Sequence, residues 1–122
     1  MAKVLGIGGI FFKTADPKAL GEWYKRVLGF PITDWGSAMF PHAGEGFTLW
    51  TPFKADTDHF APSSHPFMIN LTVDDLDGVL AKAKAEGVEP IGRQDDEYGR
   101  FAWIMDPVGV KIELYQPAED AG

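Results

Sequence analysis

One carboxylate stands in an otherwise apolar, strand-like segment and could do chemistry. Glu113 lies within the run KIELYQP, between Ile112 and the pair Leu114 and Tyr115. On an exposed strand face an acid is ordinary, whereas on a buried face its charge needs a cation, a metal ion or hydrogen-bond donors to offset desolvation. Three interpretations therefore stand: an acid paired within the protein, a ligand-binding or acid–base group, and a metal ligand.

Polar side chains in other strand-like segments could share a site with Glu113. Asn70 lies in FMINLTV two positions after Met68, so both side chains point to the same side of a strand. A buried Asn must find hydrogen-bond partners, which either a ligand or an internal bond provides. Tyr98 and Arg100, in EYGRFAW, are candidates for the rim of a cleft, with an exposed strand or pairing with Glu113 as the alternatives.

A polar loop gathers further residues of metal-binding types. It contains Asp56, Asp58, His59 and His65. Their spacing fits neither one helix face nor a hairpin, and metal sites depend on a defined geometry. We expect no metal site in this loop.

Composition limits the size of the protein and the kind of partner. With 122 residues, 45% of them apolar, the chain can build one hydrophobic core. The net charge of −7 argues against nucleic-acid and anionic membrane partners, which need clustered Lys and Arg. The sequence has no cysteine, no long apolar span and no signal-peptide pattern at its N-terminus, so we expect a cytoplasmic protein.

The first half of the chain reads as a strand, a helix and three strands. An apolar run at 7–13 is followed by Asp16 and Pro17, a helix N-cap and a proline at the first helical position. An apolar stripe continues to Gly29, where a helix C-terminus is expected. Short strand candidates follow at 32–35, 38–40 and 47–51.

The second half repeats this order after a polar segment. A strand at 67–73 precedes the caps Asp74 and Asp75 and a helix that ends at Gly87, and strands are predicted at 89–93, 99–105 and 111–116. In each half the closing Gly lies 13 positions after a capping Asp, Gly29 after Asp16 and Gly87 after Asp74. Such a repeat predicts one domain, 1–122, of two βαβββ modules at about 4–53 and 66–117, joined by a loop at about 54–65.

This pattern resembles the vicinal oxygen chelate superfamily, which includes glyoxalase I, extradiol dioxygenases and the bleomycin and fosfomycin resistance proteins. The likeness rests on DPKALGEWYKRVLGF in the first half and on VDDLDGVLAKAKAEGV and DPVGVKIELYQP in the second. It implies an α+β fold in which two βαβββ modules form curved mixed sheets around an open cleft. It also implies a homodimer, because such proteins commonly associate.

The resemblance also implies a position for the site. Members that use a metal take its ligands from the first and last strands of each half, which correspond here to Gly9, Trp50, Met68 and Glu113. Of these four side chains only the carboxylate binds a metal, and one carboxylate cannot hold a divalent catalytic ion. We therefore expect a cleft without a metal or other cofactor.

The resulting functional prediction is a protein that binds a small organic molecule. It would act by sequestration or by acid–base chemistry, and whether it is an enzyme stays open. Glu113 is the catalytic candidate, and the predicted ligand-binding residues are Gly9, Trp50, Met68, Asn70, Tyr98 and Arg100. The alternatives are a metal-dependent lyase or dioxygenase of the same superfamily and a non-catalytic sensor or binding subunit.

Overall fold

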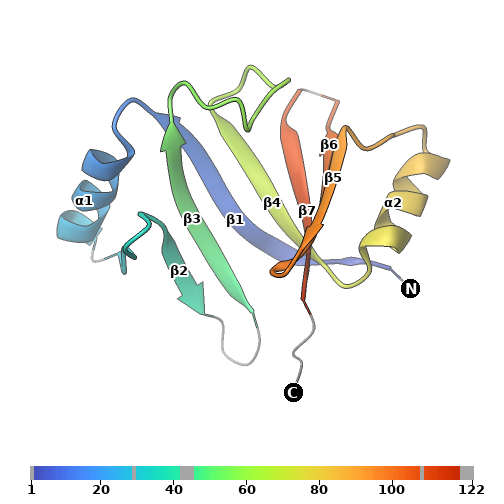
Figure 1. Ribbon diagram of the computed structural model, residues 1–122, viewed down its shortest axis with the longest axis horizontal. Helices are drawn as coiled ribbons and strands as arrows, with labels where there is room; N and C mark the ends of the chain where they lie inside the picture. The colour runs from blue at the N-terminus through green and yellow to red at the C-terminus, as the bar shows by residue number, and fades with distance from the viewer. Residues whose placement is uncertain (1, 29, 42–45, 108, 119–122) are drawn as a thin grey trace.

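In the part of the chain that the structure describes, two helices and seven strands make up the fold (Figure 1). The computed structural model describes residues 2–28, 30–41, 46–107 and 109–118. In chain order the elements are β1 (Val4–Thr14), α1 (Pro17–Leu28), β2 (Ala38–Pro41), β3 (Phe47–Lys54), β4 (Phe67–Val73), α2 (Leu76–Ala85), β5 (Gly92–Asp96), β6 (Gly99–Met105) and β7 (Lys111–Pro117).

All the strands belong to one open, mixed sheet in the order β2-β3-β1-β4-β7-β6-β5. The pairs β1–β3 and β4–β7 are parallel, and the remaining neighbours are antiparallel. β1 and β4, the first strands of the two halves, therefore lie side by side in the middle of the sheet (Figure 1). This arrangement confirms the predicted α+β fold.

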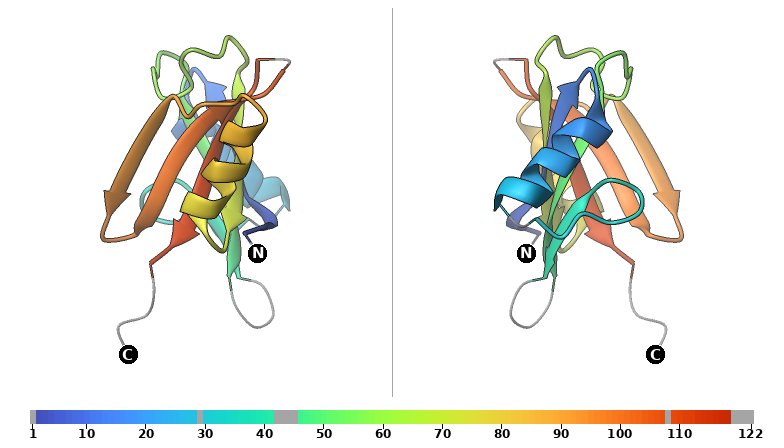
Figure 2. Two further views of the ribbon diagram at one scale, coloured as in Figure 1. Left: turned by 90° about the vertical axis from the view of Figure 1, so that its right-hand side faces the viewer. Right: turned by 90° about the vertical axis from the view of Figure 1, so that its left-hand side faces the viewer.

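Both helices lie on the same side of the sheet, near its two ends, and the β5–β6 hairpin projects to the other side (Figure 2). α1 starts where its cap predicts, because the Ala19 amide donates to Asp16 Oδ1 at 3.0 Å. α2 starts in the same way, with the Gly78 amide 3.1 Å from Asp75 Oδ1. No helix in the described part of the chain has both the length and the apolar character needed to cross a membrane.

We call the side of the sheet that carries the helices the outer face and the opposite side the inner face. Under α2 the outer face forms a buried core of Val73, Leu76, Ala102 and Leu114. Under α1 it carries Trp50, whose ring lies 4.4 Å from that of Tyr24 and 5.4 Å from that of Phe30, centroid to centroid. Burial of these apolar side chains holds both helices against the sheet.

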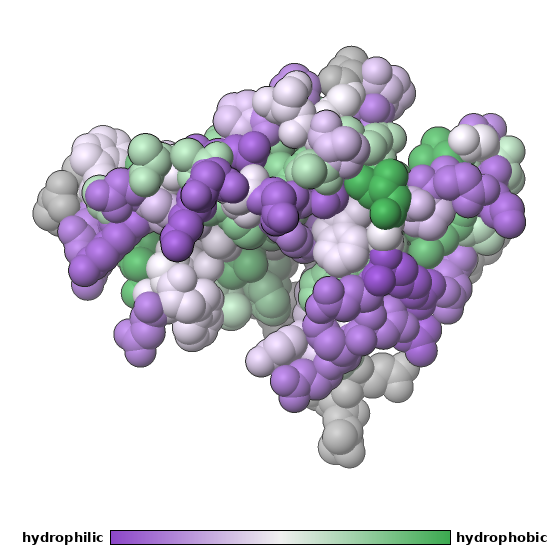
Figure 3. Space-filling view, turned by 45° about the horizontal axis from the view of Figure 1, so that its top comes forward, coloured by the Kyte–Doolittle hydropathy of each residue, from purple (hydrophilic) through white to green (hydrophobic). Residues whose placement is uncertain are grey.

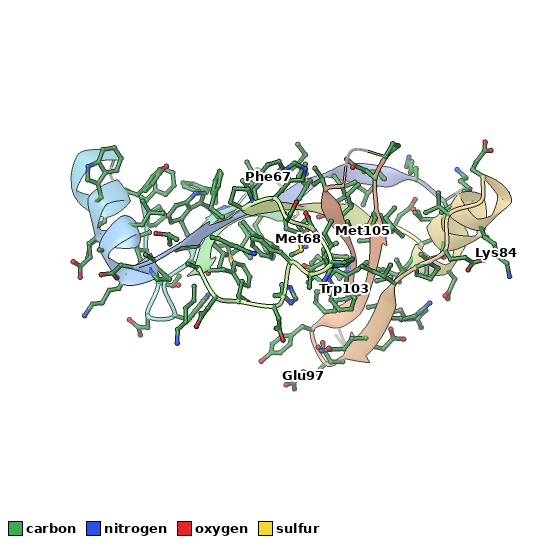
Figure 4. The ribbon with its side chains drawn as sticks, turned by 90° about the horizontal axis from the view of Figure 1, so that it is seen from above. Phe67, Met68, Lys84, Glu97, Trp103 and Met105 are labelled. Atoms are coloured by element: carbon green, nitrogen blue, oxygen red, sulfur yellow. The ribbon has the colours of Figure 1, made fainter. Side chains whose placement is uncertain are left out.

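The loop at 55–66 covers part of the inner face. Its Phe60 is fully buried and packs with Phe11 and Met68 in a second hydrophobic cluster. Met68 and its neighbour Phe67 point to opposite sides of the sheet, and Trp103 lies on the side of Met68 (Figure 4). The loop therefore forms a small core of its own beside the site described below.

Two of the predicted strands need correction. The segment 32–35 is not a strand but a turn, in which Ile32 makes an isolated bridge to Ala38 and the Thr33 hydroxyl donates to the Ser37 carbonyl at 2.9 Å. Gly36 permits this turn by its φ of 90°. The strand predicted at 89–93 begins later, at Gly92. The division into modules at 54–65 stays a prediction.

Candidate functional site

Neighbouring strands place one residue each in a row across the inner face. The sheet register pairs Leu49 with Gly9, Gly9 with Asn70, Asn70 with Glu113, and Glu113 with Trp103. Cross-strand partners project from the same face of a sheet, so this row brings side chains from both halves of the chain together. Glu113 and Asn70 are both buried.

The carboxylate of Glu113 is held by neutral N–H donors. Asn70 Nδ2 donates to its Oε1 at 2.6 Å, and the indole Nε1 of Trp103 donates to its Oε2 at 2.8 Å. Hydrogen bonds to an ionised acceptor are among the stronger ones in proteins and offset part of the cost of burying the charge. Glu113 as a whole is 7% exposed, and the two bonds fix the direction of its buried carboxylate.

A histidine from the 55–66 loop approaches the same carboxylate. His59 Nε2 lies 3.4 Å from Glu113 Oε2. The imidazole stacks on Phe53 with 5.4 Å between ring centroids and meets Trp103 edge-on at 6.0 Å. His59 therefore closes the side of Glu113 that faces the loop.

Lys111 fastens this loop to β7. Its ammonium group donates to the His59 carbonyl at 2.5 Å and lies 5.5 Å from the ring centroid of Trp103. Burial lowers the pKa of Lys111, and the charges of Glu113 and Asp58 oppose this shift. Lys111 thus acts as an anchor whose charge is turned toward the loop backbone.

A cleft of about 220 Å³ opens on the inner face beside Glu113. Apolar surface shows in the hollow between the two halves of the molecule, and hydrophilic residues border it (Figure 3). Because Glu113 and Asn70 are buried, they form its base. The lining residues are Gly8, Phe11, Trp35, Met39, Gly46, Phe47, Leu49, Asn70, Thr72, Phe101, Glu113, Tyr115 and Pro117.

Some of the predicted site residues meet at this cleft. Asn70 and Glu113 line it together. Gly9 lies in their row, although it is Gly8 that borders the cavity. Met68 is on the inner face but fully buried under the loop.

Three predicted residues lie elsewhere. Trp50 is on the outer face under α1. The position predicted for Trp50, in the row with Gly9 on the inner face, is occupied by Leu49. Arg100 pairs with Asp77 of α2 at 3.3 Å, which places it on the outer face as well. Tyr98 is 69% exposed in the turn between β5 and β6.

Trp103, Leu49 and His59 were not predicted as site residues. Trp103 had a usable signal, because the turn that begins at Asp106 joins β6 to β7, and counting outward from it pairs Trp103 with Glu113. No sequence signal indicated the position of His59, because it depends on how a long loop folds back over the sheet.

The residues of the row do not fit a metal ion. Gly9 and Leu49 offer no ligand atom, and the Asn70 amide already donates to the carboxylate. Within residues 2–28, 30–41, 46–107 and 109–118 there is no group of three or more His, Cys, Asp or Glu side chains placed to hold a metal. Catalytic metals normally have about three protein ligands, so this part of the chain does not supply them.

Fold and site together define an α+β protein with an open mixed sheet and a cleft built from both halves of the chain. Residues 6–114 match the Glyoxalase/Bleomycin resistance protein/Dioxygenase superfamily. The protein belongs to this superfamily, as the sequence pattern indicated. No curated protein sequence matches it.

Several solved structures share the fold. Methylmalonyl-CoA epimerase from Mycobacterium tuberculosis superposes with a TM-score of 0.71 at 21% identity, over 95% of this chain and 90% of the epimerase. A variant of the Streptomyces coelicolor methylmalonyl-CoA epimerase, in complex with 2-nitronate-propionyl-CoA, gives 0.74 at 18% identity, over 96% and 100% of the two chains. A superfamily member from Vibrio splendidus 12B01 gives 0.59 at 13% identity, over 95% and 99%. At these identities the likeness defines the fold only.

Proposed function

We propose that the inner-face cleft binds a small organic molecule and that Glu113 contacts it as a hydrogen-bond acceptor or a base. The observation that carries this proposal is a buried carboxylate at the base of a largely apolar cleft. A cavity with apolar walls and a few fixed polar groups is the usual form of a small-molecule site.

Glu113 is suited to such a role because its direction is fixed while acceptor capacity remains. A carboxylate has about four lone-pair sites, and Asn70 and Trp103 each use one. The remaining sites can accept a hydrogen bond from a ligand or take a proton from it. Sequestration and acid–base catalysis would both use this geometry, and turnover of a bound compound separates them.

The two alternative functions make different demands on the site. A metal-dependent lyase or dioxygenase needs ligands that the described residues do not group together. A non-catalytic sensor or binding subunit would use the same cleft without turnover. The epimerases share the fold, but their substrate carries over to this chain only if the cleft accepts it.

A thermal-shift screen against a panel of metabolites and antibiotics tests the binding proposal. A compound that binds only the folded state at about 100 times its Kd stabilises it by roughly 2.7 kcal/mol. We expect at least one compound to raise the melting temperature of the wild type and to lose most of this effect with Glu113→Gln. The amide keeps the volume of the side chain and removes its charge.

The exposed carboxylate Glu89, outside the cleft, provides the matched control. Glu89→Gln should leave the stabilisation by the same compound unchanged. Equal stabilisation of the wild type and Glu113→Gln by every active compound would contradict the assigned role of Glu113.

We also propose that the protein forms a homodimer through the outer face of β1. Ile7, Ile10 and Phe12 are 55%, 41% and 39% exposed, and Ile10 and Phe12 pair with the apolar Ile69 and Phe67 of β4. This strip lies between the helices, because α1 packs mainly on β3 and reaches β1 only in part, while α2 packs on β6 and β7. A second copy presents the same apolar strip and can cover it by two-fold symmetry.

Light scattering at micromolar concentration tests the dimer. We expect the wild type to have the mass of a dimer and Ile10→Lys to have the mass of a monomer, because the substitution buries an unpaired charge in the interface. Ile91→Lys is the matched control, since Ile91 is 47% exposed in a different part of the chain. A monomeric wild type would refute the proposed interface.

The remaining proposals concern the surroundings of the protein. A chain without cysteine suits a reducing compartment, and we propose a cytoplasmic location. The net charge of −7 supports a small-molecule ligand rather than a nucleic acid as the partner.

A further inference from the structure

The polar groups at the base of the cleft are mainly hydrogen-bond acceptors. Asn70 turns its Nδ2 toward Glu113, and its Oδ1 lies against the backbone of Gly8. A Cβ built on Gly8 would lie 2.1 Å from Asn70 Oδ1 and 2.6 Å from Thr72 Oγ1. The missing side chain of Gly8 thus lets the oxygens of Asn70 and Thr72 pack closely against its backbone, so that two acceptors lie at the base of the cleft together with the carboxylate.

From the cleft side, the charge of Glu113 has no cationic partner among the described residues. The lining residues within the described part of the chain include no Lys, Arg or His. Among the described residues, the Lys and His side chains near the carboxylate are Lys111 and His59, and both lie on its loop side. The Lys111 ammonium bonds the His59 carbonyl, and burial lowers its pKa. An anionic ligand in this cleft would therefore face an acid without a compensating donor of positive charge.

The walls suit a cation with an apolar body. Phe11, Phe47, Phe101 and Tyr115 line the cleft, and Trp35, 70% exposed, stands at its edge. Aromatic ring faces attract ammonium groups and also bury hydrocarbon. The volume of about 220 Å³ is below the range of roughly 300–1,000 Å³ usual for drug-sized ligands, which limits the ligand to one ring or a short chain.

From these observations we infer that the cleft takes a small organic ammonium compound. Its nitrogen donates to Glu113 and to the oxygens of Asn70 and Thr72, and its ring or chain packs against the aromatic walls. The inference rests on the proposed function, because it names the ligand class of the same cleft. It differs from that function in requiring a positive charge on the ligand.

Three probes of nearly the same size test this inference: benzylamine, benzyl alcohol and benzoate. Titration calorimetry at physiological salt, which screens the net charge of the protein, should show benzylamine binding at least about tenfold more tightly than benzyl alcohol. Benzoate should show no binding. With Glu113→Gln, the Kd of benzylamine should rise by at least about tenfold and that of benzyl alcohol by less than about threefold.

Two further variants make the result specific to the cleft. Gly8→Ala should weaken benzylamine binding, because its methyl group would clash with Asn70 Oδ1 and Thr72 Oγ1 and displace these two acceptors, and circular dichroism checks that the variant folds. Glu89→Gln should keep the full preference for the amine.

Equal or tighter binding of benzyl alcohol or benzoate would overturn the inference. In that case, a non-cationic compound of the panel that stabilised the wild type but not Glu113→Gln would still support the proposed function. Only the inference of an ammonium ligand would then be wrong. If no probe bound, and no panel compound lost its stabilising effect with Glu113→Gln, the proposed function and the inferred ligand class would both be wrong.

Discussion

Replacing Trp50 with alanine is expected to lower the free energy of unfolding by about 3–5 kcal/mol. Trp50 is 7% exposed, and its ring packs against Tyr24 of α1 and against Phe30 just beyond the helix. Truncation would leave a cavity under α1 that the sheet cannot collapse to fill. Urea or guanidinium denaturation, monitored by circular dichroism, measures the loss.

The neighbouring residue, Leu49, provides a control on the opposite face. It is half-buried and lines the cleft, so Leu49→Ala should cost less stability, about 1–2 kcal/mol, and should weaken the stabilisation by a cleft ligand. If Trp50→Ala instead left stability almost unchanged and abolished ligand binding, Trp50 would belong to the cleft, as the sequence-based prediction had it.

This pair shows where the sequence is informative and where it is not. The helix starts depend on local chemistry, so Asp16 with Pro17 and Asp75 could be identified from the sequence. The choice between Trp50 and Leu49 depends on register. The sequence-based alignment matched β3 to β7 through Gly46 and Gly109 and so placed Trp50 opposite Glu113. This is one residue too far, because β3 begins one position after its glycine and β7 begins two positions after its own. An error of one residue in register assigns every side chain of a strand to the wrong face of the sheet.

The same reasoning separates the residues around Glu113. Asn70 could be predicted as its neighbour, because alternation along β4 puts it on the inner face. The sequence left two interpretations of Asn70 open, an internal hydrogen bond and a position in the site. Asn70 has both, because its amide donates to Glu113 and its side chain lines the cleft. The parallel pairing of β4 with β7 has no turn that fixes it, so the distance itself could not be predicted.

The 55–66 loop is the part that no local pattern predicts. Its polar composition reads as a solvated connection, whereas its position depends on contacts between distant residues. The Ser63 hydroxyl donates to the Gly109 carbonyl at 2.6 Å, and Lys111 bonds the His59 carbonyl. These bonds tie the loop to β7 and to the turn before it, and Phe60 adds an apolar anchor.

Phe60→Ala is therefore expected to lower the free energy of unfolding by about 3–5 kcal/mol and to release the loop locally. Phe60 is fully buried against Phe11 and Met68, and its ring lies 5.1 Å from that of Phe53. Without this anchor, the bonds made by Ser63 and Lys111 and the stacking of His59 on Phe53 must hold the loop. Chemical denaturation measures the global loss, and limited proteolysis with mapping of the cut site measures the local release.

His59→Ala is the matched control, because it changes the adjacent, half-exposed residue and keeps the backbone carbonyl that Lys111 binds. We expect it to cost less than about 1 kcal/mol and to leave the loop resistant to protease. Phe60→Leu should fall between the two, since it retains part of the buried apolar volume. Equal stability and equal protease resistance of Phe60→Ala and His59→Ala would show that the polar bonds, and not Phe60, hold the loop over the inner face.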